Sequence, residues 1–353
     1  MPETRLPPTE AARERHGASV DAMAAWFDVG DPVWPLEDAP DVVTPPRWLD
    51  PGRCDRGGRA LRRHGLLTAA VLRGYCLPLS YLSRHGVKPL VMTGQLLESP
   101  ASRLHRTATF VRATHAEGAM HPGGEGWRWS ARVRTIHQRV RRRLRSRGWP
   151  RGLGAPMPQP DLAATALLFG PMLVHGLRRL GADIGREEAD DVAHLARAIA
   201  HGQGVVDALQ ADEHVQAMRL FERLTVLNPP PAEDGRRLMA QLLDVPFEVA
   251  ATSVDHALAP LVKATHRSLG AELLGEEDAR ALGLVDSGRL ARALARLAAP
   301  SLHHPRLTPI HDAMVGWVLA RNRRRLEQRR RASTDAVDER RGGRRTAALH
   351  LAR

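Results

Sequence analysis

The chain has 353 residues, a hydrophobic share of 43% and a formal net charge of +13, which is enough apolar content for one large helical domain or two ordinary ones. Cys54 and Cys76 are its two cysteines and lack metal-ligand spacing, which excludes a disulfide framework and a thiolate zinc site. The first thirty residues lack a signal-peptide core, and no apolar run reaches the roughly 18 to 20 residues that cross a bilayer, so we expect a cytoplasmic protein without a membrane span.

The positive charge is concentrated near the end of the sequence. Residues 321–353 contain 12 arginines and four acidic residues, and the whole chain has only two lysines. This distribution indicates a compositional bias more than selection for phosphate contacts. Nucleic acid is therefore an unfavoured partner on charge alone.

Apolar residues recur at helical spacing along most of the chain, whereas alternating, strand-like runs are few. The pattern predicts an all-α fold. In chain order, we expect helices at about 9–27, 58–84, 99–117, 130–147, 160–181, 186–203, 211–226, 234–244, 246–270, 287–298 and 308–331.

Residues 29–53 are rich in proline and predict an extended, ordered arm, because Trp34 and Trp48 give it apolar surface to bury. The expected organisation is an N-terminal helix and proline-rich arm at 1–57, a single large helical domain at 58–331, and a disordered basic tail at 332–353.

The stretch VRTIHQRVRRRL, residues 133–144, places one histidine among arginines. Val133, Ile136, Val140 and Leu144 follow the spacing of a buried helical face, and His137 falls in line with them, while most of the arginines should face water. A buried imidazole needs a hydrogen-bond partner or a metal, since an unsatisfied polar group costs about 1 to 3 kcal/mol. A core histidine bonded to a backbone carbonyl is one interpretation, and a metal ligand is the other.

Arg134 and Arg141 lie about one turn before and after His137 on the same side of this helix. An inward imidazole between two cations suits a haem, whose iron takes a neutral nitrogen and whose edge carries carboxylates. The alternative is that both arginines reach the surface and pair with acidic residues.

A second helix carries polar residues at an apolar seam. In SRLHRTATFVRATH, residues 102–115, Arg103 and Thr107 are four positions apart and Arg106 lies between them. A cation and a hydroxyl held over a metal could donate hydrogen bonds to bound dioxygen. An exposed position for Arg103 is the competing interpretation.

In order and spacing, these segments resemble the haem-dependent oxygenases that include the latex-clearing rubber oxygenases and the MpaB-type oxygenases. The resemblance covers roughly residues 20–300. It rests on FDVGDPVWPLEDAP, RLHRT, VRTIHQRVR and the helices that follow residue 149.

The resemblance implies an all-α domain with a buried haem pocket and haem b as cofactor. It implies that His137 is the proximal iron ligand, that Arg134 and Arg141 flank it, and that Arg103 and Thr107 act on the distal side. Arg106 stands where rubber-cleaving members have a lysine, and no carboxylate upstream of Arg103 matches the proposed base of that group. These two departures argue against rubber as the substrate.

The resemblance thus predicts an oxygenase that uses dioxygen on an apolar small molecule or a prenyl-type double bond, with Arg106 tuning the distal side. The alternative is a helical, arginine-rich protein without haem that binds nucleic acid or another acidic partner. The sequence does not indicate an oligomeric state.

Overall fold

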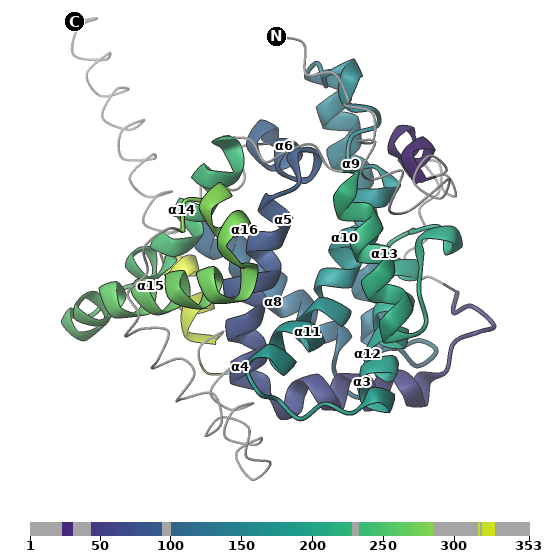
Figure 1. Ribbon diagram of the computed structural model, residues 1–353, viewed down its shortest axis with the longest axis horizontal. Helices are drawn as coiled ribbons and strands as arrows, with labels where there is room; N and C mark the ends of the chain where they lie inside the picture. Colours follow the sequence, from purple (N-terminus) through teal and green to yellow (C-terminus); the bar gives the residue numbers. More distant parts are fainter. Residues whose placement is uncertain are drawn as a thin grey trace, which may run out of the picture.

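The computed structural model describes residues 23–30, 44–93, 100–227, 233–284, 317 and 320–328. Within these ranges the regular structure is helical and contains no strand, which confirms the predicted all-α fold (Figure 1). The expected helix at 287–298, most of those at 9–27 and 308–331, and the expected tail at 332–353 lie outside the described residues.

The helices follow one another with short connections. The α-helices are α3 (Pro51–Arg63), α4 (Gly65–Val71), α5 (Leu77–Tyr81), α6 (Arg84–Thr93), α8 (Pro100–Thr114), α9 (Glu125–Ser146), α10 (Gln159–Leu168), α11 (Pro171–Arg179), α12 (Arg186–Gly202), α13 (His214–Val226), α14 (Glu233–Glu248), α15 (Ser253–Leu274) and α16 (Glu276–Ala281). There are also three 3₁₀ turns, η1 (Trp26–Asp28), η3 (Arg151–Leu153) and η4 (Asp207–Leu209), and a π-helical turn, η2 (Leu72–Cys76). Residues 23–25 and 320–328 are helical as well.

Helix α3 runs along the lower edge of the molecule and packs closely against α12 (Figure 1). Asp50 caps its first turn by accepting a hydrogen bond from the Arg53 backbone N–H, and Pro51 occupies the first helical position. A Cβ atom at Gly57 would lie 2.5 Å from the Asp191 carbonyl oxygen, so only glycine permits this approach of α3 to α12. Because α3 runs from Pro51 to Arg63, the domain boundary expected after residue 57 falls inside this helix.

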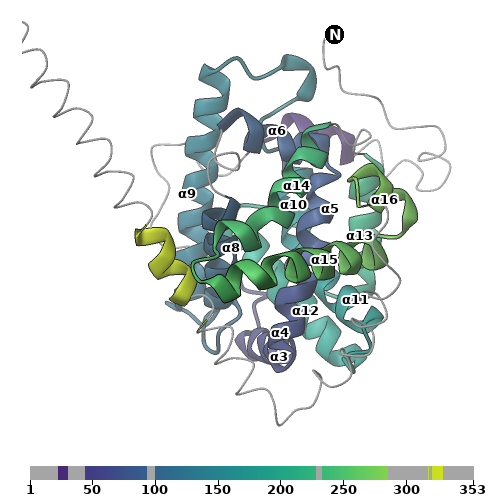
Figure 2. The ribbon, with the colours of Figure 1, turned by 90° about the vertical axis from the view of Figure 1, so that its left-hand side faces the viewer.

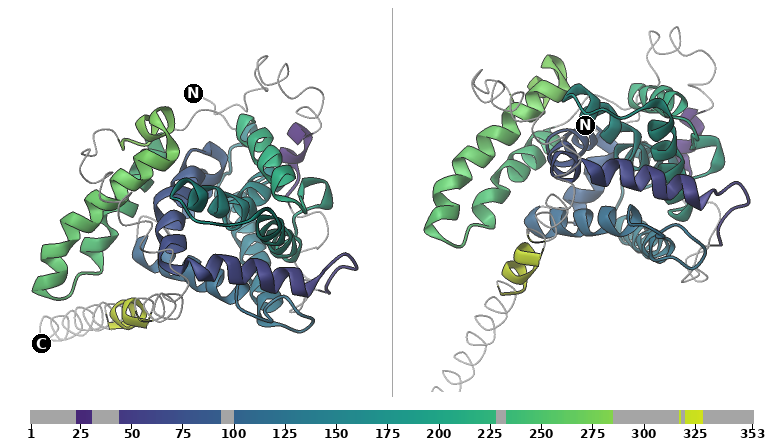
Figure 3. Two further views of the ribbon diagram at one scale, coloured as in Figure 1. Left: turned by 60° about the horizontal axis from the view of Figure 1, so that its bottom comes forward. Right: turned by 90° about the horizontal axis from the view of Figure 1, so that it is seen from below.

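The main apolar core lies between α3, α4, α8, α9, α11 and α12, and it includes the fully buried Trp127 and Leu173. A second cluster joins α10 to α13, and a third joins α5 and α6 to α14 and α16. Helices α14 and α15 lie side by side at one flank of the molecule (Figures 1 and 3). The long helix α9 stands beside α8 (Figure 2).

Two of the expected helices are interrupted in the structure. The helix predicted over 58–84 is broken at His64 and widens into the π-helical turn η2. Pro78 follows this turn, and its missing N–H and bulky ring are incompatible with a regular hydrogen bond to residue 74. The helix predicted over 160–181 bends by 41° at Gly170 and Pro171 for the same reason.

Within the described ranges, no single helix has the length and apolar character needed to cross a membrane. Two bent pairs pass that test together on length and composition, namely 65–81 with 84–93 and 159–168 with 171–179.

Candidate functional site

Helix α8 brings Arg103 and Thr107 to one internal cavity. Their spacing of one helical turn places both side chains on the same side of the helix, and both line the cavity wall. The Nη1 atom of Arg103 is buried and has no acceptor among the described residues. Burial lowers the pKa of Arg103, and the nearby charge of Arg106 lowers it further, while Tyr81 acts in the opposite direction.

The cavity has a volume of about 110 Å³ and lies between the π-helical turn and helices α5, α6, α8, α10 and α13. Its walls are partly aliphatic and aromatic and partly hydroxylated. The lining residues are Cys76, Leu77, Leu79, Ser80, Ser83, Gly86, Leu90, Arg103, Thr107, Asp161, Ala164, Thr165, Leu168, Phe169, Phe221 and Thr225.

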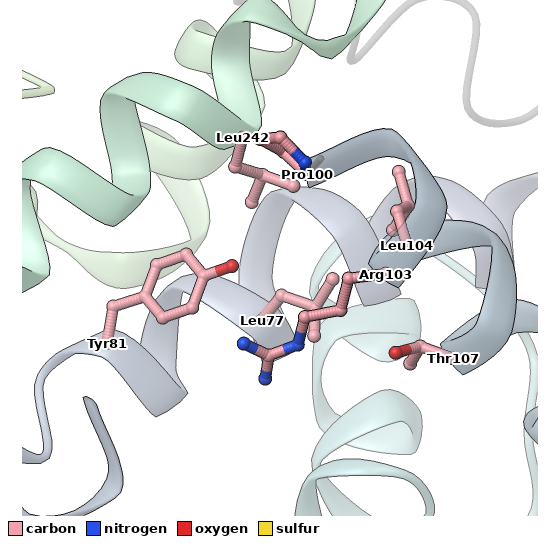
Figure 4. Close-up of a pocket in the computed structure, with 7 residues that line it drawn as sticks. All are labelled: Leu77, Tyr81, Pro100, Arg103, Leu104, Thr107 and Leu242. Atoms are coloured by element: carbon pink, nitrogen blue, oxygen red, sulfur yellow. The ribbon is translucent and has the colours of Figure 1, made fainter. Parts of the chain in front are cut away.

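On its other side, Arg103 borders a second space of about 10 Å³, roughly the room of one water molecule. Tyr81 and Leu242 form the opposite wall of this space, and the guanidinium of Arg103 extends between Tyr81 and Thr107 (Figure 4). Burial raises the pKa of Tyr81, and the charge of Arg103 moderates that rise. Arg103 therefore lies between two small spaces, with its Nη1 atom buried.

Asp161 is a cavity residue that the sequence patterns did not single out. It lies in the first turn of α10, its Oδ1 atom accepts a hydrogen bond from the Ser83 hydroxyl at 3.3 Å, and its Oδ2 atom is buried without a donor among the described residues. Burial raises the pKa of Asp161 to about 7, and the Ser83 hydrogen bond lowers it only partly. An acidic residue at the start of a mostly apolar helix looks like an ordinary first-turn residue, so no local signal distinguished it.

Arg106 does not line this cavity. Its side chain is exposed and donates a hydrogen bond from Nη1 to the Ser102 hydroxyl at 3.0 Å. It is therefore not among the residues that line the cavity, although it lies less than one helical turn from Arg103. Its charge lowers the pKa of Arg103, and its expected tuning of the distal side stays a prediction.

His137 lies on α9, half-buried, with its Nδ1 atom buried. Val133 packs against the main core, and Val140 packs against the cluster that contains Leu144, so the predicted inward face is correct at these positions. Ile136 was also predicted to face inward, and this is wrong, since its side chain is 46% exposed. The fully buried stripe of the helix is rotated to one side and runs through Arg134, Gln138 and Arg141.

Arg134 and Arg141 are 3% and 4% exposed, so the alternative interpretation, in which both reach the surface, is wrong. Arg141 donates hydrogen bonds from Nε and Nη2 to the backbone carbonyls of Pro156 and Met157 at 2.8 to 3.2 Å. Arg134 packs on Gly204, where a Cβ atom would lie 2.5 Å from the Arg134 Nε atom. Both arginines thus fasten α9 to neighbouring loops.

His137 is not among the residues that line the 110 Å³ cavity, although its helix α9 packs directly against α8. Among the residues with described positions, no group of three or more His, Cys, Asp or Glu side chains could hold a metal ion. The structure thus joins Arg103, Thr107 and Asp161 at one cavity and places His137 on the adjacent helix.

Comparisons with known proteins bear on the family and the fold of the chain. A family model described as "ER-bound oxygenase mpaB/B'/Rubber oxygenase, catalytic domain" matches residues 59–301, which is more than half of the chain. Among solved structures, one titled "Structure of Latex Clearing Protein LCP in the closed state" is similar, with a TM-score of 0.61, 20% identity, and coverage of 89% of this chain and 86% of that one. At this identity the likeness shows the fold alone. No curated protein matches the chain.

Proposed function

Because the chain belongs to the family of ER-bound mpaB-type oxygenases and rubber oxygenases, we propose that it is a haem b-dependent oxygenase that uses dioxygen to oxidise a double bond in an apolar small molecule or a prenyl chain. The observation that supports this most is that Arg103 and Thr107, one turn apart on α8, line the same cavity. Helix α8 in turn packs against α9, the helix that carries His137. The enzyme class comes from the family; the haem, the substrate class and the residue roles are part of the proposal.

One described residue, His137, fits the role of the protein ligand to a haem iron. A haem iron needs one protein ligand on its proximal side, and a single half-buried imidazole on α9 is such a donor, whereas a metal held by protein alone needs several. The orphaned Nη1 atom of Arg103 also fits, because a buried cation without an acceptor is costly unless a ligand supplies one. The cavity of about 110 Å³ is below the roughly 300 Å³ of cofactor pockets, so we assign it to substrate and not to the haem.

The bound haem would supply the iron that activates dioxygen. His137 would donate its ring nitrogen to that iron. Arg103 would orient an oxygen atom of the reactants through its free Nη1–H, and its charge would stabilise negative charge that develops there, because a guanidinium keeps its proton. Thr107 would contribute a hydroxyl from the same side of α8.

Arg134 and Arg141 would act on the haem indirectly. Since Arg141 is already bonded to two backbone carbonyls and Arg134 is packed on Gly204, we propose that they brace the His137 helix instead of binding propionates. The apolar walls formed by Leu77, Leu168 and Phe169 would keep water from the reacting atoms.

The test is the absorption spectrum of the purified protein with and without dithionite. A Soret band that shifts on reduction supports the proposal, and His137→Ala should lower the haem content at least tenfold. His105→Ala is the matched control, since His105 is also half-buried but lies on α8. A full haem content and an unchanged spectrum in His137→Ala would overturn the ligand assignment, and a colourless wild-type protein that cannot be loaded with haem would overturn the function.

A further inference from the structure

The cavity beside Arg103 contains a carboxyl group that the protein leaves half-satisfied. Ser83 donates to the Oδ1 atom of Asp161, and the orientation of this hydroxyl is set because its oxygen accepts the Gly86 backbone N–H at 3.0 Å. The Oδ2 atom is buried and has no donor among the described residues. A buried polar atom without a partner costs about 1 to 3 kcal/mol, so this oxygen indicates a place for a ligand group.

The two charged residues on the cavity lining bear on what that group can be. Arg103 attracts an anion and repels a cation, and an ionised Asp161 does the reverse. A hydroxyl group is neutral and both donates and accepts hydrogen bonds, so it can pair with Asp161 whether the carboxyl is ionised or neutral. An alcohol therefore pairs with Asp161 in both of its protonation states without repulsion from Arg103.

The size and the remaining walls of the cavity define the rest of the ligand. An apolar cavity of about 150 Å³ in another protein binds benzene, which has six carbon atoms. A volume of about 110 Å³ thus suits a head of about five or six heavy atoms. Leu77, Leu168, Phe169 and Phe221 supply an apolar wall for its carbon atoms, and Asp161 lies on the same lining for its oxygen.

We propose that this cavity binds the head of an alcohol substrate, a small apolar unit that carries one hydroxyl group, with Asp161 as the hydrogen-bond partner of that hydroxyl. The inference deepens the proposed oxygenase function by naming the substrate class, and it rests on that function only for the reaction that follows binding. A pure hydrocarbon would leave the buried polar atoms of Asp161 and Arg103 unpaired, and such a site rejects ligands that lack the matching polar group.

The experiment compares two small probes of the same carbon skeleton, 3-methylbut-2-en-1-ol and 2-methylbut-2-ene. Each is titrated into the full-length protein with ¹³C-labelled leucine methyl groups, and the shifts of the Leu77 and Leu168 methyls report binding in the cavity. The measured quantity is the ratio of the two dissociation constants. No oxygen, reductant or turnover is needed.

Asp161→Leu should reduce the preference for the alcohol about tenfold or more relative to the wild-type protein, since it removes the hydrogen-bonding atoms and keeps a similar volume. Asp161→Asn should keep the preference within about threefold, because an amide still donates and accepts. Asp278→Asn is the matched control, since burial also raises the pKa of that carboxyl but Asp278 lies on α16, away from the cavity. An unchanged ratio in Asp161→Leu, or probe binding that leaves the two leucine methyls unshifted, would overturn the proposal.

A pH series keeps the test decisive if Asp161→Leu does not fold. The wild-type preference for the alcohol should rise between pH 6 and pH 8, as Asp161 ionises and becomes a stronger acceptor, and should stay flat in Asp161→Asn. The other ionisable groups on the cavity lining are Arg103 and Cys76, and burial raises the pKa of the Cys76 thiol well above this range. A pH-dependent preference in Asp161→Asn would contradict the assignment.

The two proposals fail separately. A colourless protein with the expected alcohol preference would refute the haem and retain the binding site. A haem-loaded protein without that preference would retain the oxygenase and refute the alcohol head.

Discussion

Arginine and aspartate side chains lie together at two sites in the structure, and the two sites differ in how completely their hydrogen bonds are paired. Between α3 and α12, Arg53 donates to Asp191 at 3.2 Å and to Asp212 at 2.7 Å, and His194 shares a 2.6 Å hydrogen bond with Asp212. Two backbone carbonyls accept the remaining Arg53 donor, and Arg56 satisfies the second oxygen of Asp191. At the cavity, Arg103 and Asp161 each retain a buried polar atom with no partner among the described residues.

The difference is visible in the acidity of the two carboxyl groups. Burial raises the pKa of Asp212, but hydrogen bonds from Arg53 and His194 outweigh it and bring the value to about 2. Burial dominates at Asp161 and brings its pKa to about 7. A fully paired network of polar side chains stabilises the packing of its helices. An incompletely paired network lowers stability, and a site of this second kind is a candidate for ligand binding.

The largest expected effect is at the incomplete site. Arg103→Met should lower oxygen uptake with 3-methylbut-2-en-1-ol about 100-fold or more, since one preorganised donor in a dry site is worth about that much. Its stability should be unchanged or higher, because methionine fills the space without a buried unpaired charge. Oxygen-electrode rates and urea unfolding measure the two effects. A clear loss of stability in Arg103→Met would show that this arginine is structural.

The matched change in the complete network should do the opposite. Arg53→Met should lower the free energy of unfolding by about 2 to 3 kcal/mol, because it leaves Asp191 and Asp212 without their shared cation. The side chain of Arg53 is 24% exposed, so the effect is placed below that of a fully buried pair. Oxygen uptake per folded molecule should stay within about twofold. Urea unfolding would contradict the comparison if Arg53→Met and Arg103→Met were equally stable.

The two carboxyl groups should differ in the pH at which they affect stability. Between about pH 4 and pH 7, Asp161 carries a proton in the folded protein and loses it in the unfolded protein. The contribution of Asp161 to the free energy of unfolding therefore falls as pH rises through this range. Asp161→Asn should therefore raise stability by about 1 to 2 kcal/mol at pH 8 and have little effect at pH 4.

Asp212 has a lowered pKa, so its stabilising contribution is present above about pH 4 and is lost as pH falls towards 2. Asp212→Asn should cost about 1 to 2 kcal/mol at pH 7, and the difference from the wild-type protein should disappear near pH 2. Unfolding curves at pH 2, pH 4 and pH 8 for both variants test the pair of signs, because Asp161 acts between pH 4 and pH 8 and Asp212 between pH 2 and pH 4. The same pH trend in both variants would refute the contrast.

Most helices could be predicted from the sequence because each buries one apolar stripe, and the period of that stripe is visible in the residues. The breaks at His64 and Gly170 could not, because they lie inside apolar runs where the periodicity continues. On α9 the period was visible but its phase was ambiguous. Ile136 was placed inside, and Arg134 could be assigned either to the inward side or to the surface, because apolar character alone does not show that a guanidinium can be buried against carbonyls and glycine.

The candidate site was predictable only where its residues belong to one helix. Arg103 and Thr107 could be paired from their spacing, and the structure places both on one cavity, while their catalytic roles stay predictions. Asp161 and Ser83 come from different elements, and their meeting depends on how α10 packs beside α5. No spacing along the chain predicts such a contact, so the role of the Asp161 carboxyl group could be recognised only once the fold was known.

The smallest expected effect is that of changing Arg106, the exposed neighbour of the cavity residue Arg103 on α8. Arg106→Gln should change the free energy of unfolding by no more than about 0.5 kcal/mol, because its side chain is exposed and its hydrogen bond to the Ser102 hydroxyl one turn away is at the surface. Removing this charge relieves part of the repulsion that lowers the pKa of Arg103, so oxygen uptake with 3-methylbut-2-en-1-ol should change about twofold at most. That small change should shrink further in 0.5 M salt, since an exposed charge is screened, whereas the loss in Arg103→Met should be insensitive to salt. Equal losses of oxygen uptake in Arg106→Gln and Arg103→Met would mean that the two arginines act together at the site and that the outward orientation of Arg106 does not describe the working protein.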